Sequence, residues 1–360
     1  MYIHVIEATA TGTLSMASLL ANAQSLDGHR VTVIYSIRDE TPANINDLFN
    51  TEVELIHLDM TSFMGKISAP IKLAKIINKS ASNKVVLHSS FSGFIGRLSG
   101  LICSKDINYF YIPHCISFMR KDIGKFKHQL FIALEKIASL KECVYIACSE
   151  SEKKIIEQNL PKVDCRLVEN AVSNDFTGKV NLESLGDMAL QVITVGQIRT
   201  QKNPELFAEI CRLITSINQN INFTWIGDGN DLQKNILMKH GVKVTGWLSR
   251  DEVIASLKVS DIYLSTSDWE GLPVSIIEAN YAGIPVIASN CPGNSDVIKN
   301  GITGWLFENS EEAVELLLNI KNTDIDIRRI ARTAQVEAID RFSKSQYVSA
   351  MNKIMSNISS

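Results

Sequence analysis

Short apolar runs and longer helical stretches alternate along the chain, and this pattern occurs twice. In the first half the apolar runs are rich in Val, Ile and aromatic residues and have the length of strands. Strands that alternate with helices are typical of a parallel sheet covered by helices on both faces. The strands predicted for this half are Ile3–Glu7, Arg30–Ser36, Val53–Asp59, Lys84–Ser90, Asn108–His114 and Val144–Ser149.

A polar segment at 170–187, rich in turn-forming residues, interrupts the pattern and predicts a linker between two domains. We therefore expect an α/β protein with two Rossmann-like, doubly wound domains at 1–175 and 188–340, followed by a C-terminal helix at 341–360. The strands predicted for the second domain are Gln191–Gly196, Asn222–Gly227, Val242–Trp247, Asp261–Ser267, Pro285–Asn290 and Gly304–Glu308.

Composition narrows the class of protein. A chain of 360 residues with 45% hydrophobic and 21% charged residues is ordinary globular material that can bury two cores. The net charge of −3 argues against a nucleic-acid partner. No apolar run approaches the ~18 to 20 residues of a membrane-spanning helix, and the first residues lack the basic segment of a secretory signal. Seven cysteines without a Cys-x-x-Cys pair fit reduced thiols, so the expected location is the cytoplasm.

The stretch Asp268–Ala279 carries the most specific chemistry. It follows a predicted buried strand and continues into a helix that begins just after Pro273. Glu270 lies directly before a Gly-Leu-Pro turn, and Glu278 lies in the helix after this turn. The backbone N–H groups at a helix start have no partner within the helix and lie at the positive end of its dipole. Gly271 has no side chain to keep an anion away, so this corner predicts a diphosphate site.

Two cations follow an earlier strand of the same domain. Arg199 and Lys202 come after the strand that ends at Gly196, and doubly wound sheets bind ligands in the loops after the carboxyl ends of strands. Both cations suit a clamp on phosphate oxygens that stabilises a departing diphosphate. On spacing alone, a pair of solvated surface cations is an equally good interpretation. The loop Cys291–Asp296 follows another strand and is consistent with a simple turn.

A series of segments in the second half occurs in a family-specific order: Val195–Asn203, Trp225–Gly229, Val244–Trp247, Glu270–Pro273, Glu278–Ala279, Gly283–Ser289 and Asn300–Phe307. Looser matches in the first half are His88–Ser90, Gly93–Arg97, Pro113–His114 and Glu169–Val172. With these segments the chain resembles the retaining glycosyltransferases of family four, which have the two-domain GT-B architecture. It is most similar to members that build bacterial surface polysaccharides. The resemblance implies two domains that face each other across a cleft, with the C-terminal helix returning to the N-terminal domain.

The resemblance also implies roles for single residues. Glu278 would bind the ribose hydroxyls of the nucleotide and Glu270 the transferred sugar, since a carboxylate accepts hydrogen bonds in pairs. Lys202 and Arg199 would clamp the diphosphate, although the family commonly has arginine directly after the glycine, where this chain has Gln197. The other residues implied for the donor site are Gly271, Leu272, Gly12, Gly246 and Trp247, and His114 would line the sugar pocket near the reacting carbon. Gly12 would belong to a glycine loop at Thr9–Thr13 that closes over the phosphates, ahead of a helix that we expect to begin at Leu14. Trp247 at a strand end and His114 beside a proline also fit purely structural roles.

The implied reaction is transfer of a hexosyl or N-acetylhexosaminyl group, with retention, from a nucleoside-diphosphate sugar to a hydroxyl of a glycan or lipid-linked acceptor. A UDP-sugar is favoured over a GDP-sugar as substrate, and the family needs no further cofactor, metal or protein nucleophile. The Asp324-Ile325-Asp326 triplet looks like a metal-binding Asp-x-Asp but lies in a helical region away from strand ends.

The acceptor is expected to bind the first domain, where basic residues precede the apolar stretch Leu130–Leu134. This region is either an amphipathic surface that meets anionic lipid at the inner face of the cytoplasmic membrane or a solvated helix face. Two other functions stay open: a sugar-nucleotide epimerase on the same architecture, and a non-catalytic nucleotide-sugar-binding subunit. An NAD-dependent oxidoreductase is disfavoured because the first loop lacks Gly-x-Gly-x-x-Gly. The basic residues are Arg120, Lys121, Lys125, Lys127 and His128.

Overall fold

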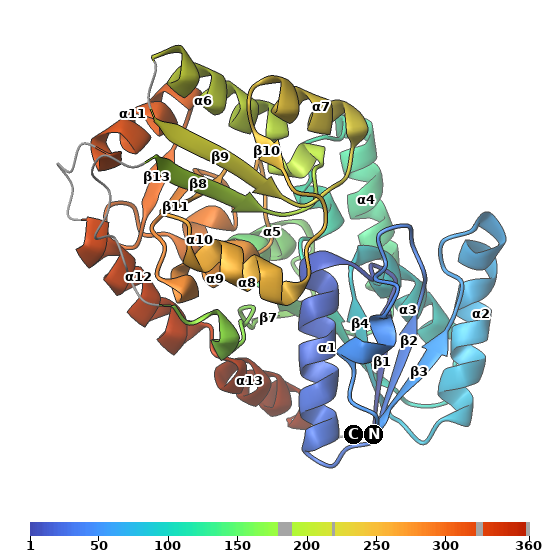
Figure 1. Cartoon of the computed structure of the whole chain (residues 1–360). Coiled ribbons are helices and arrows are strands. Elements are labelled where there is room, and N and C mark those ends of the chain that lie inside the picture. The colour runs from blue at the N-terminus through green and yellow to red at the C-terminus, as the bar shows by residue number, and fades with distance from the viewer. Residues whose placement is uncertain (179–188, 218–219, 322–326, 358–360) are drawn as a thin grey trace. The chain divides into compact units, whose positions relative to one another are not determined.

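The computed structural model describes residues 1–178, 189–217, 220–321 and 327–357, and the chain divides into two compact units (Figure 1). The first unit is Met1–Asn170 together with Lys344–Ser360, and the second is Ala171–Ser343. Most of the linker expected at 170–187 lies outside the described residues. Its described part belongs to the second unit, where it forms the short 3-10 helix η3 (Asn174–Phe176).

The first unit contains a parallel sheet of seven strands in the order β3-β2-β1-β4-β5-β6-β7. All six predicted strands are present, and their ends differ from the prediction by at most two residues. The seventh, β7, was not predicted because it is an edge strand of only four residues, two of them charged, and has no continuous apolar run. The strands are β1 (Tyr2–Ile6), β2 (Val31–Tyr35), β3 (Val53–His57), β4 (Lys84–His88), β5 (Asn108–Ile112), β6 (Val144–Ala147) and β7 (Asp164–Leu167).

Helices cover both faces of this sheet because successive side chains of a strand point to opposite faces. Ile3 and Val5 of β1 pack in the core beneath α2 to α5, whereas Ile6 packs with Leu14 and Ala17 of α1. α13, near the end of the chain, contacts α1 and so belongs to the first unit. The helices are α1 (Thr11–Leu26), α2 (Phe63–Lys79), α3 (Ser90–Ile102), α4 (Lys125–Ala138), α5 (Glu150–Asn159) and α13 (Lys344–Ser356), with 3-10 helices η1 (Ile45–Leu48) and η2 (Ser117–Met119).

The second unit contains a parallel sheet of six strands in the order β10-β9-β8-β11-β12-β13. All six predicted strands exist, although β10 has only two residues. The strands are β8 (Leu190–Val195), β9 (Ile221–Ile226), β10 (Lys243–Val244), β11 (Ile262–Ser265), β12 (Val286–Ser289) and β13 (Trp305–Phe307). The helices are η4 (Thr200–Lys202), α6 (Pro204–Ser216), α7 (Asp231–Lys239), α8 (Arg250–Lys258), α9 (Val274–Ala282), α10 (Asn294–Val297), α11 (Ser310–Lys321) and α12 (Ile327–Arg341).

Each sheet has one point at which the strand order changes direction. In the first unit the chain winds from β1 out to β3 and then starts again at β4, which pairs with β1. In the second unit it winds from β8 out to β10 and starts again at β11, which pairs with β8. The loops beyond such neighbouring strands leave in opposite directions and open a crevice at the carboxyl edge, where doubly wound sheets bind ligands.

Candidate functional site

At the carboxyl edge of the second sheet, the predicted cation and the predicted carboxylate are in contact. Lys202 is the last residue of η4, in the connection after β8, and Glu270 lies in the loop after the neighbouring strand β11. Lys202 Nζ is 2.7 Å from Glu270 Oε1. Residues predicted for diphosphate and sugar therefore form one ion pair at the expected edge of the sheet.

The Glu270 carboxylate has a full set of partners. Besides Lys202, it accepts hydrogen bonds from Ser267 Oγ at 2.7 Å and from Gln201 Nε2 at 3.0 Å. Glu270 is buried, and its backbone N–H donates to the carbonyl of Pro292. Burial disfavours the charged form of Lys202, but the carboxylate of Glu270 outweighs it and raises the Lys202 pKa above its ordinary value. Lys202 is therefore charged in the folded protein and forms its ion pair with Glu270.

One backbone and one side-chain hydrogen bond join the two loops. Asp268 N–H donates to the Gln201 carbonyl, and Asn203 Nδ2 donates to Asp268 Oδ1, both at 2.9 Å. Asn203 has the left-handed φ of +46° and caps α6 through a bond from Leu206 N–H. These residues hold the site without being predicted for it. Their signal in the sequence is weak, because an Asn before a proline predicts a helix cap and not a partner 65 residues away.

Helix α9 presents Glu278. It begins directly after Pro273, as predicted, and is buried on all sides except at Val274, Ser275 and Glu278. Among the described residues, the Glu278 carboxylate has neither a hydrogen-bond nor an ion-pair partner. Burial raises its pKa to about 7, and the positive charges of Arg250 and Lys202 oppose this rise. A half-buried carboxylate without a partner is costly, so α9 carries an acceptor that a ligand can satisfy.

The other residues predicted for the donor site of this unit differ in burial and in backbone conformation. Gly271 and Leu272 are buried in the loop between Glu270 and α9. Arg199 caps the start of η4 and is exposed, so it lies at the solvent end of the same loop. Gly246 follows β10 with φ of +76°, and its carbonyl accepts from Gly227 N–H at 3.0 Å. Trp247 is 54% exposed, which rules out the core role that a tryptophan at a strand end commonly has.

In the first unit Gly12 lies inside a helix. α1 begins at Thr11, so the prediction of a loop up to Thr13 and a helix from Leu14 was wrong. The reason is that Ala10 acts as the N-cap without a side-chain hydrogen bond, a start that polar-cap rules do not reveal. The first turn contains no acidic residue and keeps its N–H groups available to an anion.

His114 follows β5 in strained backbone. His114 has φ of +52° and Cys115 has φ of +91°, a conformation that costs of order 1 to 3 kcal/mol for side chains other than glycine. Glu152, at the start of α5, holds this turn, because its Oε1 accepts from the N–H groups of Cys115 and Ile116, each at 2.8 Å. Burial raises the pKa of Glu152. Sequence reasoning missed Glu152, which looks like an ordinary first-turn acid.

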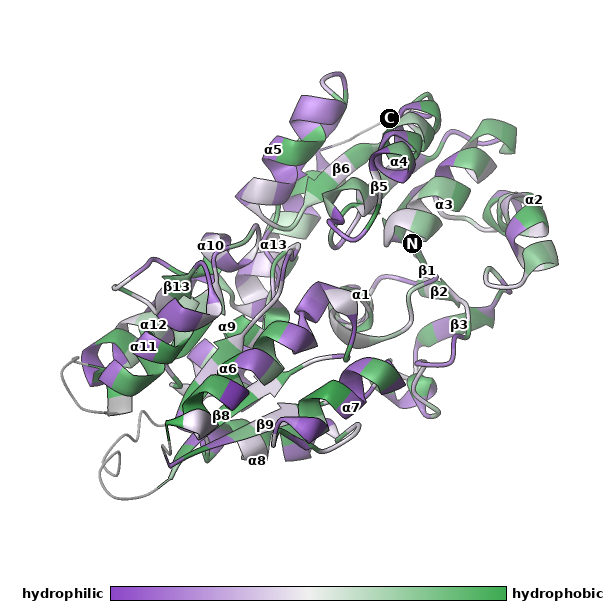
Figure 2. Ribbon diagram, turned by 90° about the horizontal axis from the view of Figure 1, so that it is seen from above, coloured by the Kyte–Doolittle hydropathy of each residue, from purple (hydrophilic) through white to green (hydrophobic). Residues whose placement is uncertain are grey.

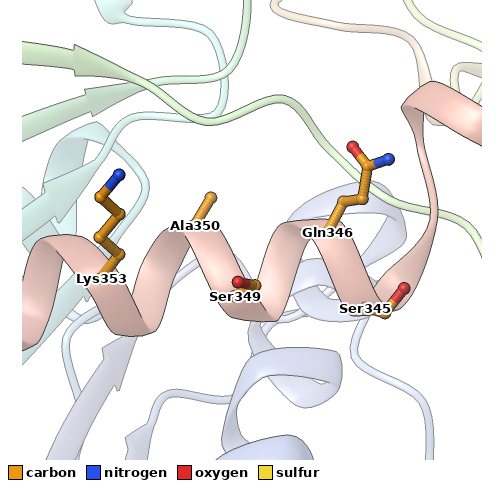
Figure 3. A pocket seen from close by; sticks show the side chains of 5 residues that line it. All are labelled: Ser345, Gln346, Ser349, Ala350 and Lys353. Carbon is orange, nitrogen blue, oxygen red and sulfur yellow. The ribbon is translucent and has the colours of Figure 1, made fainter.

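The other features of the described structure give less evidence for a functional site. Residues 322–326, with the Asp-x-Asp triplet, lie outside the described part of the chain, within which no group of three or more His, Cys, Asp or Glu residues is arranged to hold a metal. None of the seven cysteines forms a disulfide. A hollow along one side of α13 is lined by residues that were not predicted for the site (Figure 3). These residues are Ser345, Gln346, Ser349, Ala350 and Lys353.

Comparison with solved structures defines the fold class. The chain superposes on the Anabaena protein Alr3699/HepE, in a crystal structure with UDP and glucose, with a TM-score of 0.80 at 15% identity, covering 99% of this chain and 100% of that one. Both units thus form the pair of Rossmann-like domains of the GT-B fold, with the C-terminal helix in the first unit.

Family models match both halves. The model described as Glycosyltransferase Family 4 matches residues 12–176, and the model described as Glycosyl transferases group 1 matches residues 183–336. The chain belongs to the family-4 type of glycosyltransferases that these two models describe, as the ordered motifs predicted.

Two curated relatives have similar length. A Klebsiella pneumoniae protein described as an uncharacterized 41.2 kDa protein in the cps region is 26% identical over 328 residues, covering 88% of each chain. An Escherichia coli relative is named UDP-Gal:alpha-D-GlcNAc-diphosphoundecaprenol alpha-1,3-galactosyltransferase. It is 28% identical over 268 residues, which cover 69% of this chain and 68% of the relative.

Proposed function

We propose that this glycosyltransferase moves a hexosyl or N-acetylhexosaminyl group from a UDP-sugar to a hydroxyl of a lipid-linked glycan, with retention at the anomeric carbon, in surface polysaccharide synthesis. The observation that carries the proposal is the arrangement at the switch point of the second sheet. A charged Lys202–Glu270 pair lies beside α9, whose Glu278 carboxylate lacks a partner in the described structure.

The chemistry of these groups suits a nucleotide-sugar donor. Glu278 accepts hydrogen bonds from two vicinal ribose hydroxyls, and the open start of α9 accepts the diphosphate. Lys202 stabilises the charge that develops on the leaving diphosphate, and Glu270 orients Lys202 and meets the sugar. Catalysis then consists of positioning and electrostatic stabilisation, with the acceptor hydroxyl attacking on the face from which the diphosphate departs. No metal and no protein nucleophile take part.

The relatives support the choice of substrates. The Escherichia coli relative is named for a UDP-sugar donor and a lipid-diphosphate acceptor, and the Anabaena structure contains UDP and glucose. The Klebsiella relative is described by its place in a cps region. Their names favour UDP as the nucleotide and a diphosphate-linked lipid as the acceptor class.

The test is a product assay with purified protein. UDP-galactose, UDP-glucose, UDP-N-acetylglucosamine and GDP-mannose are each incubated with an N-acetylglucosamine-diphospholipid, with and without EDTA. We expect a disaccharide lipid from a UDP-sugar, the same anomeric configuration in product and donor by NMR, and no loss of rate with EDTA. An altered or free sugar formed without the acceptor would support the epimerase. Nucleotide binding without turnover across a broad acceptor panel would support a non-catalytic subunit.

An exposed apolar face on the first unit supports a membrane-bound acceptor. Within the predicted apolar stretch Leu130–Leu134, Leu130 is exposed, whereas Ile132 is buried and Phe131 packs on the core. Arg120 pairs with Asp122 at 2.7 Å. Large apolar side chains are exposed on α2 and α4, which both contact α3. We call them the basic apolar face: Phe63, Met64, Ile67 and Ile71 on α2, and Phe126, Leu130, Ile137 and Leu140 on or just after α4.

Charge around this face favours anionic lipid. Helix α2 carries four lysines and no acid, and the one acid of α4, Glu135, is buried against Arg97. Figure 2 shows both hydrophobic and hydrophilic residues on α2 and on α4. No helix in the described ranges is long and apolar enough to cross a bilayer. We therefore propose peripheral binding, in which apolar side chains insert while each lysine near the surface adds about 1 kcal/mol.

Vesicle sedimentation tests this surface. We expect the protein to sediment with phosphatidylglycerol vesicles at low salt, less at high salt, and not with phosphatidylcholine vesicles. The double variant Ile67→Ser and Phe126→Ser should lose most of this binding. Val336→Ser, which removes an exposed apolar side chain of the second unit, is the matched control. Equal sedimentation of the double variant and the control would refute the assignment.

A further inference from the structure

Three histidine rings of the first unit form a row across neighbouring strands. His4 Nδ1 lies 3.0 Å from His88 Nε2, and His88 Nδ1 lies 3.2 Å from His114 Nε2. The ring planes are nearly parallel, at 16° and 11°, and the ring centroids lie 5.3 Å and 5.5 Å apart, in each case about 2.3 Å more than the distance between the paired nitrogens. That excess is the sum of the lengths from the two nitrogens to their own ring centres, so the paired nitrogens face each other in the ring plane, as a hydrogen bond requires.

Sheet register explains why the row forms. His4 on β1 pairs with Val86 on β4, two residues before His88, and His88 pairs with Ile112 on β5, two residues before His114. Side chains two residues apart share a face of the sheet. Each step therefore moves one strand across and two residues towards the carboxyl edge. The row runs from the buried middle of β1 to the strained turn after β5, next to the switch point of this sheet.

The hydrogen bonds along the row all run in the same direction, and the contacts of His4 at the inner end determine this direction. A neutral imidazole has one N–H and one lone pair, so each ring donates on one side and accepts on the other. Gln24 Oε1 lies 2.8 Å from His4 Nε2, and Gln24 Nε2 lies 3.5 Å from Met355 Sδ on α13. A thioether only accepts, so the amide N–H group of Gln24 faces the sulfur and its carbonyl faces His4. His4 then carries its proton on Nε2, as do His88 and His114 in turn.

This direction leaves a lone pair at the outer end. His114 Nδ1 is buried and has no hydrogen-bond partner in the described structure. A buried acceptor without a partner costs about 1 to 3 kcal/mol, which a bound hydroxyl group would recover. Glu152 fixes the backbone at Cys115, so the ring is anchored through its main chain as well as through Nε2.

The row does not suit proton transport. Burial lowers the pKa values of His4 and His114 to about 4 and the pKa of His88 well below its ordinary value. The inner end is an amide oxygen, which is not a base at neutral pH. The row therefore fixes the orientation of each ring and the nitrogen that carries its proton, but it does not carry protons.

We propose that Met355, Gln24, His4 and His88 are positioning residues that hold His114 in its Nε2-protonated tautomer, so that Nδ1 accepts a hydrogen bond from a substrate hydroxyl. The identity of that hydroxyl, on the donor sugar or on the acceptor, rests on the proposed function. The tautomer itself does not. A C-terminal helix thereby sets the hydrogen-bonding role of a side chain at the opposite end of a buried row.

Nitrogen NMR of the imidazole rings tests the tautomer without turnover. In protein labelled with ¹⁵N-histidine, and with signals assigned from single His→Asn variants, we expect His114 to carry its proton on Nε2. Met355→Leu keeps the volume but removes the sulfur acceptor, and Gln24→Leu removes the carbonyl. Both should give His114 a measurable Nδ1-protonated fraction, whereas Met351→Leu, a substitution at an equally buried position on the same helix, should not. A wild-type His114 protonated on Nδ1, or tautomers unmoved in both variants, would overturn the proposal.

Kinetics then identify the hydroxyl. With UDP-galactose and an N-acetylglucosamine-diphospholipid as probes, Gln24→Leu should lower kcat/KM roughly tenfold, the effect of one lost hydrogen bond. A rise in the donor KM alone indicates a donor hydroxyl, and a rise in the acceptor KM alone indicates an acceptor hydroxyl. Unchanged kinetics beside a shifted tautomer would overturn the substrate contact. A wild-type protein inactive with every sugar nucleotide would refute the proposed function instead and leave the NMR result to decide the row.

Discussion

Lys202 Nζ lies 2.7 Å from Glu270 Oε1, and this ion pair joins the loops that follow two neighbouring strands of the second sheet. The Lys202 side chain is only 17% exposed and that of Glu270 only 9%. Removing one partner of such a pair lowers the stability of the protein strongly, because the other charge is left buried without a partner. The pair also gives the two loops a fixed spacing before any ligand binds.

Lys202→Met should therefore destabilise the protein by about 3 to 5 kcal/mol. Urea unfolding measures this change. Lys234→Met is a matched control because it breaks a more exposed pair of similar length, Lys234–Asp228 at 2.9 Å, and should cost less than about 1 kcal/mol. Equal losses for the two variants would show that burial of the Lys202–Glu270 pair has no energetic weight.

Donor affinity should depend on pH through Glu278. The ionised carboxylate accepts hydrogen bonds more strongly than the protonated form, and its pKa is about 7 in the folded protein. The affinity for UDP-glucose should then rise roughly five- to tenfold between about pH 6 and about pH 8. Isothermal titration measures the affinity, and a UDP-sugar avoids the terminal phosphate ionisation of free UDP. Glu278→Gln should bind more weakly and show a flat profile, and a variant that kept the wild-type slope would remove Glu278 from the site.

Stability should respond to pH in the opposite direction. The pKa of Glu278 is about 7 in the folded chain and 4.5 as its ordinary value, so between these values the folded protein binds the proton more strongly than the unfolded chain. The protonated Glu278 side chain therefore adds to the free energy of unfolding at low pH. This contribution is lost as pH rises through this window, by up to about 3 kcal/mol. Glu278→Gln should lack this loss. Urea unfolding curves of both proteins at several pH values provide the comparison, and parallel pH profiles would contradict the assignment.

The turn at His114 should depend on Glu152. In the wild-type protein both carboxylate oxygens of Glu152 accept hydrogen bonds from backbone N–H groups. Glu152→Gln keeps only one accepting oxygen, so the strained turn should relax and the free energy of unfolding should fall by about 1 to 3 kcal/mol. Activity should fall with it, because His114 moves. Glu157→Gln changes an exposed acid of the same helix and serves as the control, with no expected effect on turnover. A Glu152→Gln protein with full stability and full activity would show that the turn needs no such anchor.

Prediction from sequence succeeded where the signal is local and failed where it depends on distant partners. The strands of both sheets and the helix after Pro273 follow from apolar runs and turn residues, so they were found. β7 was missed because an edge strand needs no continuous apolar run. The start of α1 was misplaced because Ala10 lacks a capping side chain.

The candidate site divides in the same way. Sequence alone selected Lys202, Glu270 and Glu278, since residue type, spacing and the ordered family motifs are properties of the chain itself. The tertiary structure alone decided that Glu270 is paired and Glu278 is not, because pairing depends on β8 lying beside β11 and on which face of α9 is left uncovered. The row from Gln24 to His114 has the same origin. Strand register places its members in line, and burial makes their hydrogen bonds matter.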